Sequence, residues 1–142
     1  MGAARKQEAE MTKYLISFRE GAMDFRDEEE LVEVAEAGSA MTREAMEAGV
    51  WVFGGGLKGD HEDASVVGAD GVVTDGPYPE SKEHIGGFIV VDVASREEAL
   101  EWAAKCAAAC RCAQEVREFL PEPTEDDPVP EGVIENFRER RS

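Results

Sequence analysis

The chain has 142 residues, 42% of them hydrophobic, and a formal net charge of −17 at pH 7. This length and composition suit one domain with a single core of two packed layers and leave no room for a second domain. The negative charge would repel a phosphate backbone, and no run of Lys or Arg with interleaved aromatic residues interrupts it. We therefore expect no direct binding of nucleic acid.

The distribution of apolar residues bears on location. No apolar run approaches the roughly 20 residues that a membrane span needs, and residues 1–10 lack the apolar centre of a signal peptide. We expect residues 1–10 to be a disordered tail, and the protein to be cytoplasmic and to make no contact with a membrane.

In the first half of the chain, the pattern predicts a strand, a helix and a second strand. Residues 12–18 alternate with period two, which is typical of a strand. From Glu28 to Ala48, apolar or small residues recur at steps of three and four and predict one buried stripe on an amphipathic helix. The stripe consists of Leu31, Val34, Ala35, Gly38, Met41, Ala45 and Ala48. Gly49 is expected to end this helix, and the glycines at 54–56 to terminate a short strand over 50–53.

The second half predicts a hairpin, a strand, a helix and a last strand. Residues 64–67 and 72–74 form the hairpin, and residues 87–93 form a strand that is apolar on both faces. Ser95 and Glu98 make a capping-box pattern at the start of a helix that continues to Cys110. Residues 112–119 return to strand-like composition.

Three cysteines, Cys106, Cys110 and Cys112, lie close together near the end of this second helix. Their odd number and crowding are not typical of a secreted disulfide scaffold, so we expect reduced thiols. No histidine lies near them in sequence, and no second pair completes a set of four metal ligands. We interpret them as small buried residues, and we predict no metal and no cofactor.

The element order predicts an α+β fold. It corresponds to two split βαβ units, that is, a ferredoxin-like antiparallel sheet with both helices on one face, over residues 11–120. The other face would be bare, and the doubly apolar strand at 88–93 would then need a second copy to cover it, so we expect a homodimer. Residues 121–142 are rich in proline and acid and are expected to be an extended, solvated tail.

Four segments resemble the YCII-related proteins that carry a DGPF motif: TKYLISF, AGVWVFGGGL, VTDGPYPESKEHIGGFIVVDV and SREEALEWAAKCAAACRCAQEVREF, with Tyr78 in place of the phenylalanine. The resemblance implies a dimeric α+β barrel built from ferredoxin-like halves. It also implies a histidine and aspartate pair in a cleft, of which only Asp75 falls on a family motif here. Some relatives are linked to sigma factors.

Candidate catalytic residues lie in the loop that follows Asp75. Pro77 and Pro79 each fix φ and restrict the residue before them, so the loop is semi-rigid and suits a general base or hydrogen-bond acceptor. Asp75 is our candidate for that role, although an aspartate before glycine also commonly accepts hydrogen bonds from the amides of its own turn. His84 is the candidate proton relay, or else a solvent-facing residue with no role.

Three further residues complete the predicted site. Tyr78 is a hydrogen-bond donor or a wall of the site, and Lys82 is an auxiliary polar group. Trp51 lines the sheet, either in a dimer core or as the wall of a pocket. The sequence thus supports two hypotheses. The first is a protein that binds or transforms a small molecule near Asp75, and the second is a non-catalytic module that docks a partner such as a sigma factor.

Overall fold

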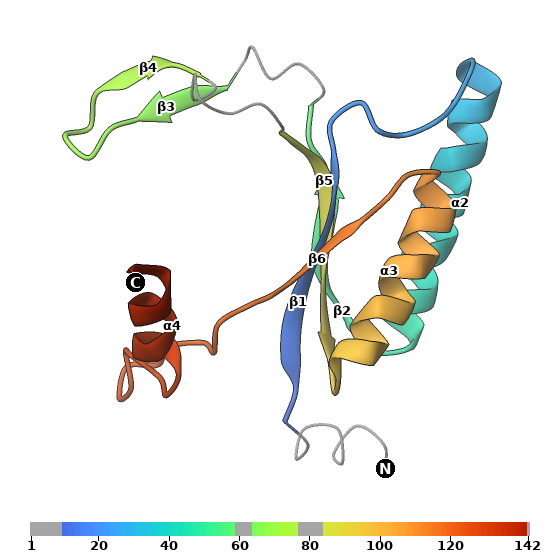
Figure 1. The fold of residues 1–142 in the computed structure, drawn as a ribbon. Helices are drawn as coiled ribbons and strands as arrows, with labels where there is room; N and C mark the ends of the chain where they lie inside the picture. The colour runs from blue at the N-terminus through green and yellow to red at the C-terminus, as the bar shows by residue number, and fades with distance from the viewer. Residues whose placement is uncertain (1–9, 59–63, 77–83, 142) are drawn as a thin grey trace.

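The computed structural model describes residues 10–58, 64–76 and 84–141 and has an α+β architecture (Figure 1). The described elements follow one another along the chain as β1 (Thr12–Arg19), α2 (Glu28–Glu47), β2 (Trp51–Gly56), β3 (Ser65–Val67), β4 (Val73–Asp75), β5 (Ile85–Val93), α3 (Arg96–Cys110), β6 (Glu115–Glu118) and α4 (Val133–Arg141). Among the helices of these ranges, none is both long and apolar enough to cross a membrane.

Four strands form an antiparallel sheet in the order β2-β5-β1-β6, and β3 pairs with β4 as a separate hairpin. Helix α2 connects β1 to β2 across β5, and α3 connects β5 to β6 across β1. Both helices lie on the same face of the sheet (Figure 1). The predicted split βαβ order, the antiparallel sheet and the one-sided helices are therefore confirmed.

The register separates the sheet into a helix face and an open face, because residues directly opposite each other in an antiparallel pair point to the same side. Tyr14 pairs with Val91 on the helix face and Leu15 pairs with Val90 on the open face. The helix face supplies the core, which the two helices complete. Its buried residues are Tyr14, Ile16, Met41, Ala45, Val50, Val91, Val93, Ala99, Trp102, Ala103, Cys106 and Ala109.

The open face is also apolar, as the sequence of β5 predicts. Val90 is 8% exposed because its neighbours on the same face surround it, whereas Phe53 is 63% exposed. Phe88 lies next to Phe53, with their ring centroids 6.0 Å apart. Neither α2 nor α3 covers this face.

Strand β2 is longer than predicted. The expectation that the glycines at 54–56 terminate the strand is wrong, because β2 runs through all three. The reason lies in the neighbouring strand: a Cβ at Gly54 would be 2.7 Å from the carbonyl oxygen of Phe88. Glycine therefore lets β2 approach β5 closely and pair with it up to the end of the triplet.

Helix α2 begins and ends as its sequence predicts. The Asp27 carboxylate accepts a hydrogen bond from the amide of Glu30 at 2.9 Å, which caps the helix start. Gly49 follows the helix with φ +77°, a conformation that favours glycine. The expected buried stripe is only partly correct. Val34, Met41 and Ala45 are buried, but Leu31 is 40% exposed, and Ala35 and Ala48 are also exposed.

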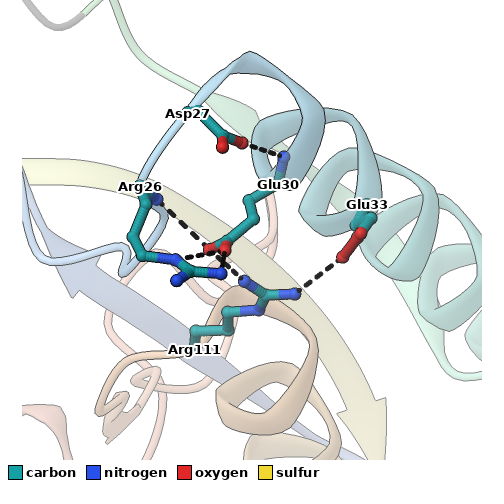
Figure 2. Close-up of polar contacts among 5 residues, drawn as sticks. All are labelled: Arg26, Asp27, Glu30, Glu33 and Arg111. Carbon is teal, nitrogen blue, oxygen red and sulfur yellow. Dashed lines mark hydrogen bonds and ion pairs between the residues drawn. The ribbon is translucent and has the colours of Figure 1, made fainter.

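Helix α3 starts at the predicted cap, where the Ser95 hydroxyl accepts a hydrogen bond from the amide of Glu98 at 3.2 Å. It ends at Arg111, which adopts φ +57° without being glycine. Figure 2 shows why an arginine stands there. Its guanidinium lies 3.1 Å from a carboxylate oxygen of Glu30 and 3.4 Å from one of Glu33 (Figure 2). These two ion pairs connect the end of α3 to the start of α2, and Arg26, just before α2, contacts the same Glu30 carboxylate.

Substitutions at Arg111 should distinguish the contribution of its ion pairs to stability from the cost of its left-handed backbone conformation. Arg111→Ala loses both ion pairs and keeps the left-handed conformation, so we expect it to lower the free energy of unfolding by about 0.5–1 kcal/mol. Arg111→Gly loses the same pairs but relieves a backbone cost of roughly 1 kcal/mol, so we expect it to unfold close to wild type. Urea unfolding of the two variants measures the difference, and equal stabilities would contradict this account.

The three cysteines are free thiols, as predicted. Cys106 is buried, and its sulfur lies 3.7 Å from the sulfur of Met41; Cys110 and Cys112 are half-buried. Burial raises the pKa of Cys106 from 9.0 to about 12. Burial also raises the pKa of Cys110 and of Cys112. Because the thiolate is the reactive form, these thiols are protonated and unreactive at neutral pH, which agrees with a packing role.

The raised pKa of Cys106 predicts a loss of stability in alkali. Above pH about 9 the unfolded chain releases the thiol proton, while the folded chain keeps it until about pH 12, so unfolding becomes easier as the pH rises. The cost is about 1.4 kcal/mol per pH unit within that window. Urea unfolding of wild type and Cys106→Ala between pH 7 and 11 tests this, since the difference between the two should shrink as the pH rises. A constant difference would contradict it.

The C-terminal region differs from its prediction in one respect. Residues 121–142 are expected to be extended, yet Val133–Arg141 forms the helix α4. Three arginines in its last turn, Arg138, Arg140 and Arg141, complement the helix dipole. No side chain of α4 is fully buried.

Candidate functional site

A cavity of about 530 Å³ lies between α2 and the sheet; we call it the α2 cavity. The sheet contributes apolar side chains to its lining, including Phe18, Trp51 and Ile89. Helix α3 contributes the thiols of Cys106 and Cys110. Ligand pockets in proteins commonly have this size and a mostly apolar lining with a few polar groups.

Gly38, in the middle of α2, is one reason that this space is open. A Cβ at Gly38 would meet no other atom within 4 Å, although the residue lines the cavity. Glycine inside a helix costs stability relative to alanine, and here no close packing demands it. Ala35 lies one turn earlier on the same stripe and also borders the cavity, which explains why it is exposed.

Trp51 reaches the α2 cavity because of an irregularity in β2. Two residues of β2, spaced by two, would normally point to the same face. The register shifts between Trp51 and Phe53, however, so that Trp51 pairs with Val91 on the helix face and Phe53 with Val90 on the open face. The sequence prediction that Trp51 lines the sheet agrees with its place beside the core and in the cavity wall.

The polar groups around the α2 cavity are few. Ser39 and Thr42 come from α2, and Gln114 comes from the segment before β6. Arg43 is the one charged side chain in the lining, which contains no carboxylate. Among the residues that the structure describes, Arg43 forms no ion pair. The sequence analysis did not single out Gly38 or Arg43 as site residues; the available signal was a glycine on the inward stripe of a long helix.

Asp75 lies elsewhere. It ends β4, pairs with Ser65 in the outlying hairpin, and is exposed. This hairpin stands apart from the helices that form the α2 cavity (Figure 1), and Asp75 does not line that cavity. Within the described ranges no hydrogen bond reaches its carboxylate. Tyr78 and Lys82 lie outside the described residues.

His84 lies at the start of β5, beside the end of β1. Its carbonyl oxygen accepts a hydrogen bond from the amide of Glu20 at 2.7 Å. Its side of the sheet borders a smaller cleft of about 350 Å³, which shares Phe18 and Gln114 with the lining of the α2 cavity. Asp75 is not in the lining of this cleft either.

The described part of the chain contains no cluster of three His, Cys, Asp or Glu side chains that could hold a metal ion. With Trp51 at the α2 cavity, His84 at the smaller cleft and Asp75 on the hairpin, the described candidates do not form one constellation. The structure instead has a mostly apolar cavity, the α2 cavity, with one cationic side chain, Arg43, in its lining.

No curated protein matches the sequence. The model of the YCII-related domain matches residues 12–122, which span β1 to β6 and include α2, α3 and the hairpin. Helix α4 falls outside the match. This match covers most of the chain and includes every element that forms the α2 cavity, so the chain belongs to the YCII-related domain family.

Proposed function

We propose that this protein binds a small, largely apolar molecule with an anionic group in the α2 cavity, and that it does so as a homodimer. The observation that carries the proposal is the cavity itself: about 530 Å³ of space beside Phe18, Trp51 and Ile89. Apolar chambers of this size with a few polar groups are the usual form of a small-molecule site.

The charge distribution supports an anionic group on the ligand. The chain as a whole carries a formal charge of −17, so an anion would be repelled unless a cation received it locally. Arg43 is that cation, since its guanidinium is unpaired among the described residues and the cavity lining holds no carboxylate. Guanidinium and carboxylate groups match in geometry and form paired hydrogen bonds.

The open face of the sheet supports the homodimer. Strand β5 is apolar on both faces, and only the helix face is covered by α2 and α3 (Figure 1). Phe53 is 63% exposed beside Phe88, and Leu15 lies on the same face on the far side of Val90. A second copy that packs its own open face here would remove the central side chains Leu15, Phe88 and Val90 from water and complete a barrel-like pair of sheets, with Phe53 at the rim.

Filling the cavity should weaken binding strongly without unfolding the protein. Gly38→Leu places a side chain in space where no atom lies within 4 Å of the Cβ, and leucine also favours a helix. We expect it to lower affinity at least tenfold for phenylalkanoic and medium-chain carboxylates, measured by calorimetry and by Trp51 fluorescence in a Trp102→Phe background. Gly38→Ala is the matched control and should retain most binding. Unchanged affinity in Gly38→Leu would rule out the α2 cavity as the site.

The anion preference has its own test. Arg43→Gln should weaken the binding of the same carboxylates by roughly five- to tenfold, because it removes a charge-assisted hydrogen bond. The binding of the corresponding alcohols should not change. Equal losses for acids and alcohols would contradict a role for Arg43 in recognising the anion.

Acid/base chemistry by Asp75 and His84 remains a separate proposal, supported by the two prolines that follow Asp75 in the sequence. Each ligand that binds is incubated with wild type, Asp75→Asn and His84→Gln and followed by proton NMR. Turnover by wild type that is lost in a variant with unchanged binding would support a role for that residue. The same turnover in the variant, or none in wild type, would contradict it.

A further inference from the structure

The chain continues past its family match as a C-terminal arm, which we define as residues 123–141. The arm leaves the sheet at β6, next to the hydrogen bond from the amide of Phe119 to the carbonyl oxygen of Lys13 at 2.9 Å. In Figure 1 it lies on the side of the sheet opposite α2 and α3, with α4 held away from the strands. It therefore extends into the space that the open face borders.

Helix α4 packs only partly within its own chain, since Val133 and Asn136 are half-buried beside the sheet. It has nine residues and no buried side chain, whereas isolated helices shorter than about 12–15 residues are marginal in water. Ile134 is 49% exposed and Phe137 is 53% exposed, and they lie one turn apart on the helix. An apolar surface on so short a helix requires a partner surface.

Between the arm and the sheet lies a hollow of about 760 Å³. Leu15 and Arg117 border it from the sheet, and Pro123, Pro128 and Val133 border it from the arm. Its lining is mainly apolar, so the hollow is suited to apolar side chains from outside.

The opposite edge of the same sheet presents such side chains. Strand β2 is the edge strand farthest from β6, and its Val52 and Phe53 are 42% and 63% exposed. When two open faces pack about a two-fold axis that runs along the strands, β6 of one copy lies over β2 of the other, and the same contact occurs twice. The alternative axis, across the strands, would bring β2 to β2 and β6 to β6, so each arm would meet the β6 edge of the partner instead of Val52 and Phe53.

Charge favours the same arrangement. The last turn of α4 carries Arg138, Arg140 and Arg141, while the whole chain has 32 acidic and 15 basic residues. Two such acidic chains repel each other. The arm itself holds six acidic residues and three arginines, so only the arginine-rich end of α4, laid on the partner, reduces that repulsion locally.

We propose that each C-terminal arm lies across the β2 edge of a second copy, with Ile134 and Phe137 packed against Val52 and Phe53 of that copy and the arginines of α4 directed at its acidic surface. This inference rests on the proposed homodimer. The arm covers an edge strand and an exposed aromatic residue that the facing sheets alone would leave at the rim.

Cross-linking tests the contact in the full-length chain. Phe137→p-benzoylphenylalanine is prepared with equal parts of unlabelled and ¹⁵N-labelled protein, irradiated and analysed by mass spectrometry. We expect cross-linked peptides of mixed label that join α4 to residues 51–56. Cross-links confined to a single chain, or joined to another region of the partner, would overturn the inference.

Sedimentation measurements test the arm contact and the homodimer separately. Phe137→Ser should raise the dimer dissociation constant at least tenfold, and Phe53→Ser should do the same, whereas Phe25→Ser, a control at a phenylalanine that is 40% exposed outside the arm and β2, should leave it unchanged. A dimer that Phe137→Ser does not weaken overturns the arm contact and leaves the homodimer standing. A wild-type chain that is monomeric at micromolar concentration overturns both.

Discussion

The fold depends on β5, a strand that is apolar on both faces and lies between β1 and β2 in the sheet. On one side Val91 and Val93 are fully buried beneath the helices and anchor the core. On the other side Val90 and Phe88 form the centre of the open face. Burial of apolar surface is the main force that holds such layers together. One strand therefore contributes both to the interior of the domain and to its open apolar face.

The two helices bury different numbers of side chains. Helix α3 buries five side chains along its length, including Trp102 and Cys106, and so packs closely. Helix α2 is longer and buries only Val34, Met41 and Ala45. The ion pairs from Arg111 to Glu30 and Glu33 hold the start of α2 in place although few apolar contacts do so. A helix fixed at its end by charges can stand over an internal space that a fully packed helix would close.

The sequence predicts the order of elements, the one-sided arrangement, the Ser95 cap of α3 and the end of α2 at Gly49, because these follow from local periodicity and from single residues. The extension of β2 could not be predicted, since the role of Gly54 is visible only once β5 lies beside it. The cavity was missed for a similar reason, because Gly38 fits a buried stripe whether or not anything packs against it. The composition of the segment after Asp75 predicted a site there, yet the hairpin that carries Asp75 lies away from the α2 cavity. Neither a ligand nor a sigma-factor partner can be deduced from such sequence patterns.

The irregular pairing at Val52 has a consequence for the interior. In a strand with regular alternation, Phe53 would lie beside Trp51 under α2, and its phenyl ring would occupy part of the α2 cavity. The single unmatched residue sends that ring outward instead. The same register shift therefore keeps the α2 cavity open and places an exposed aromatic ring on the open face. Any change that makes the pairing of β2 regular would alter both features at once.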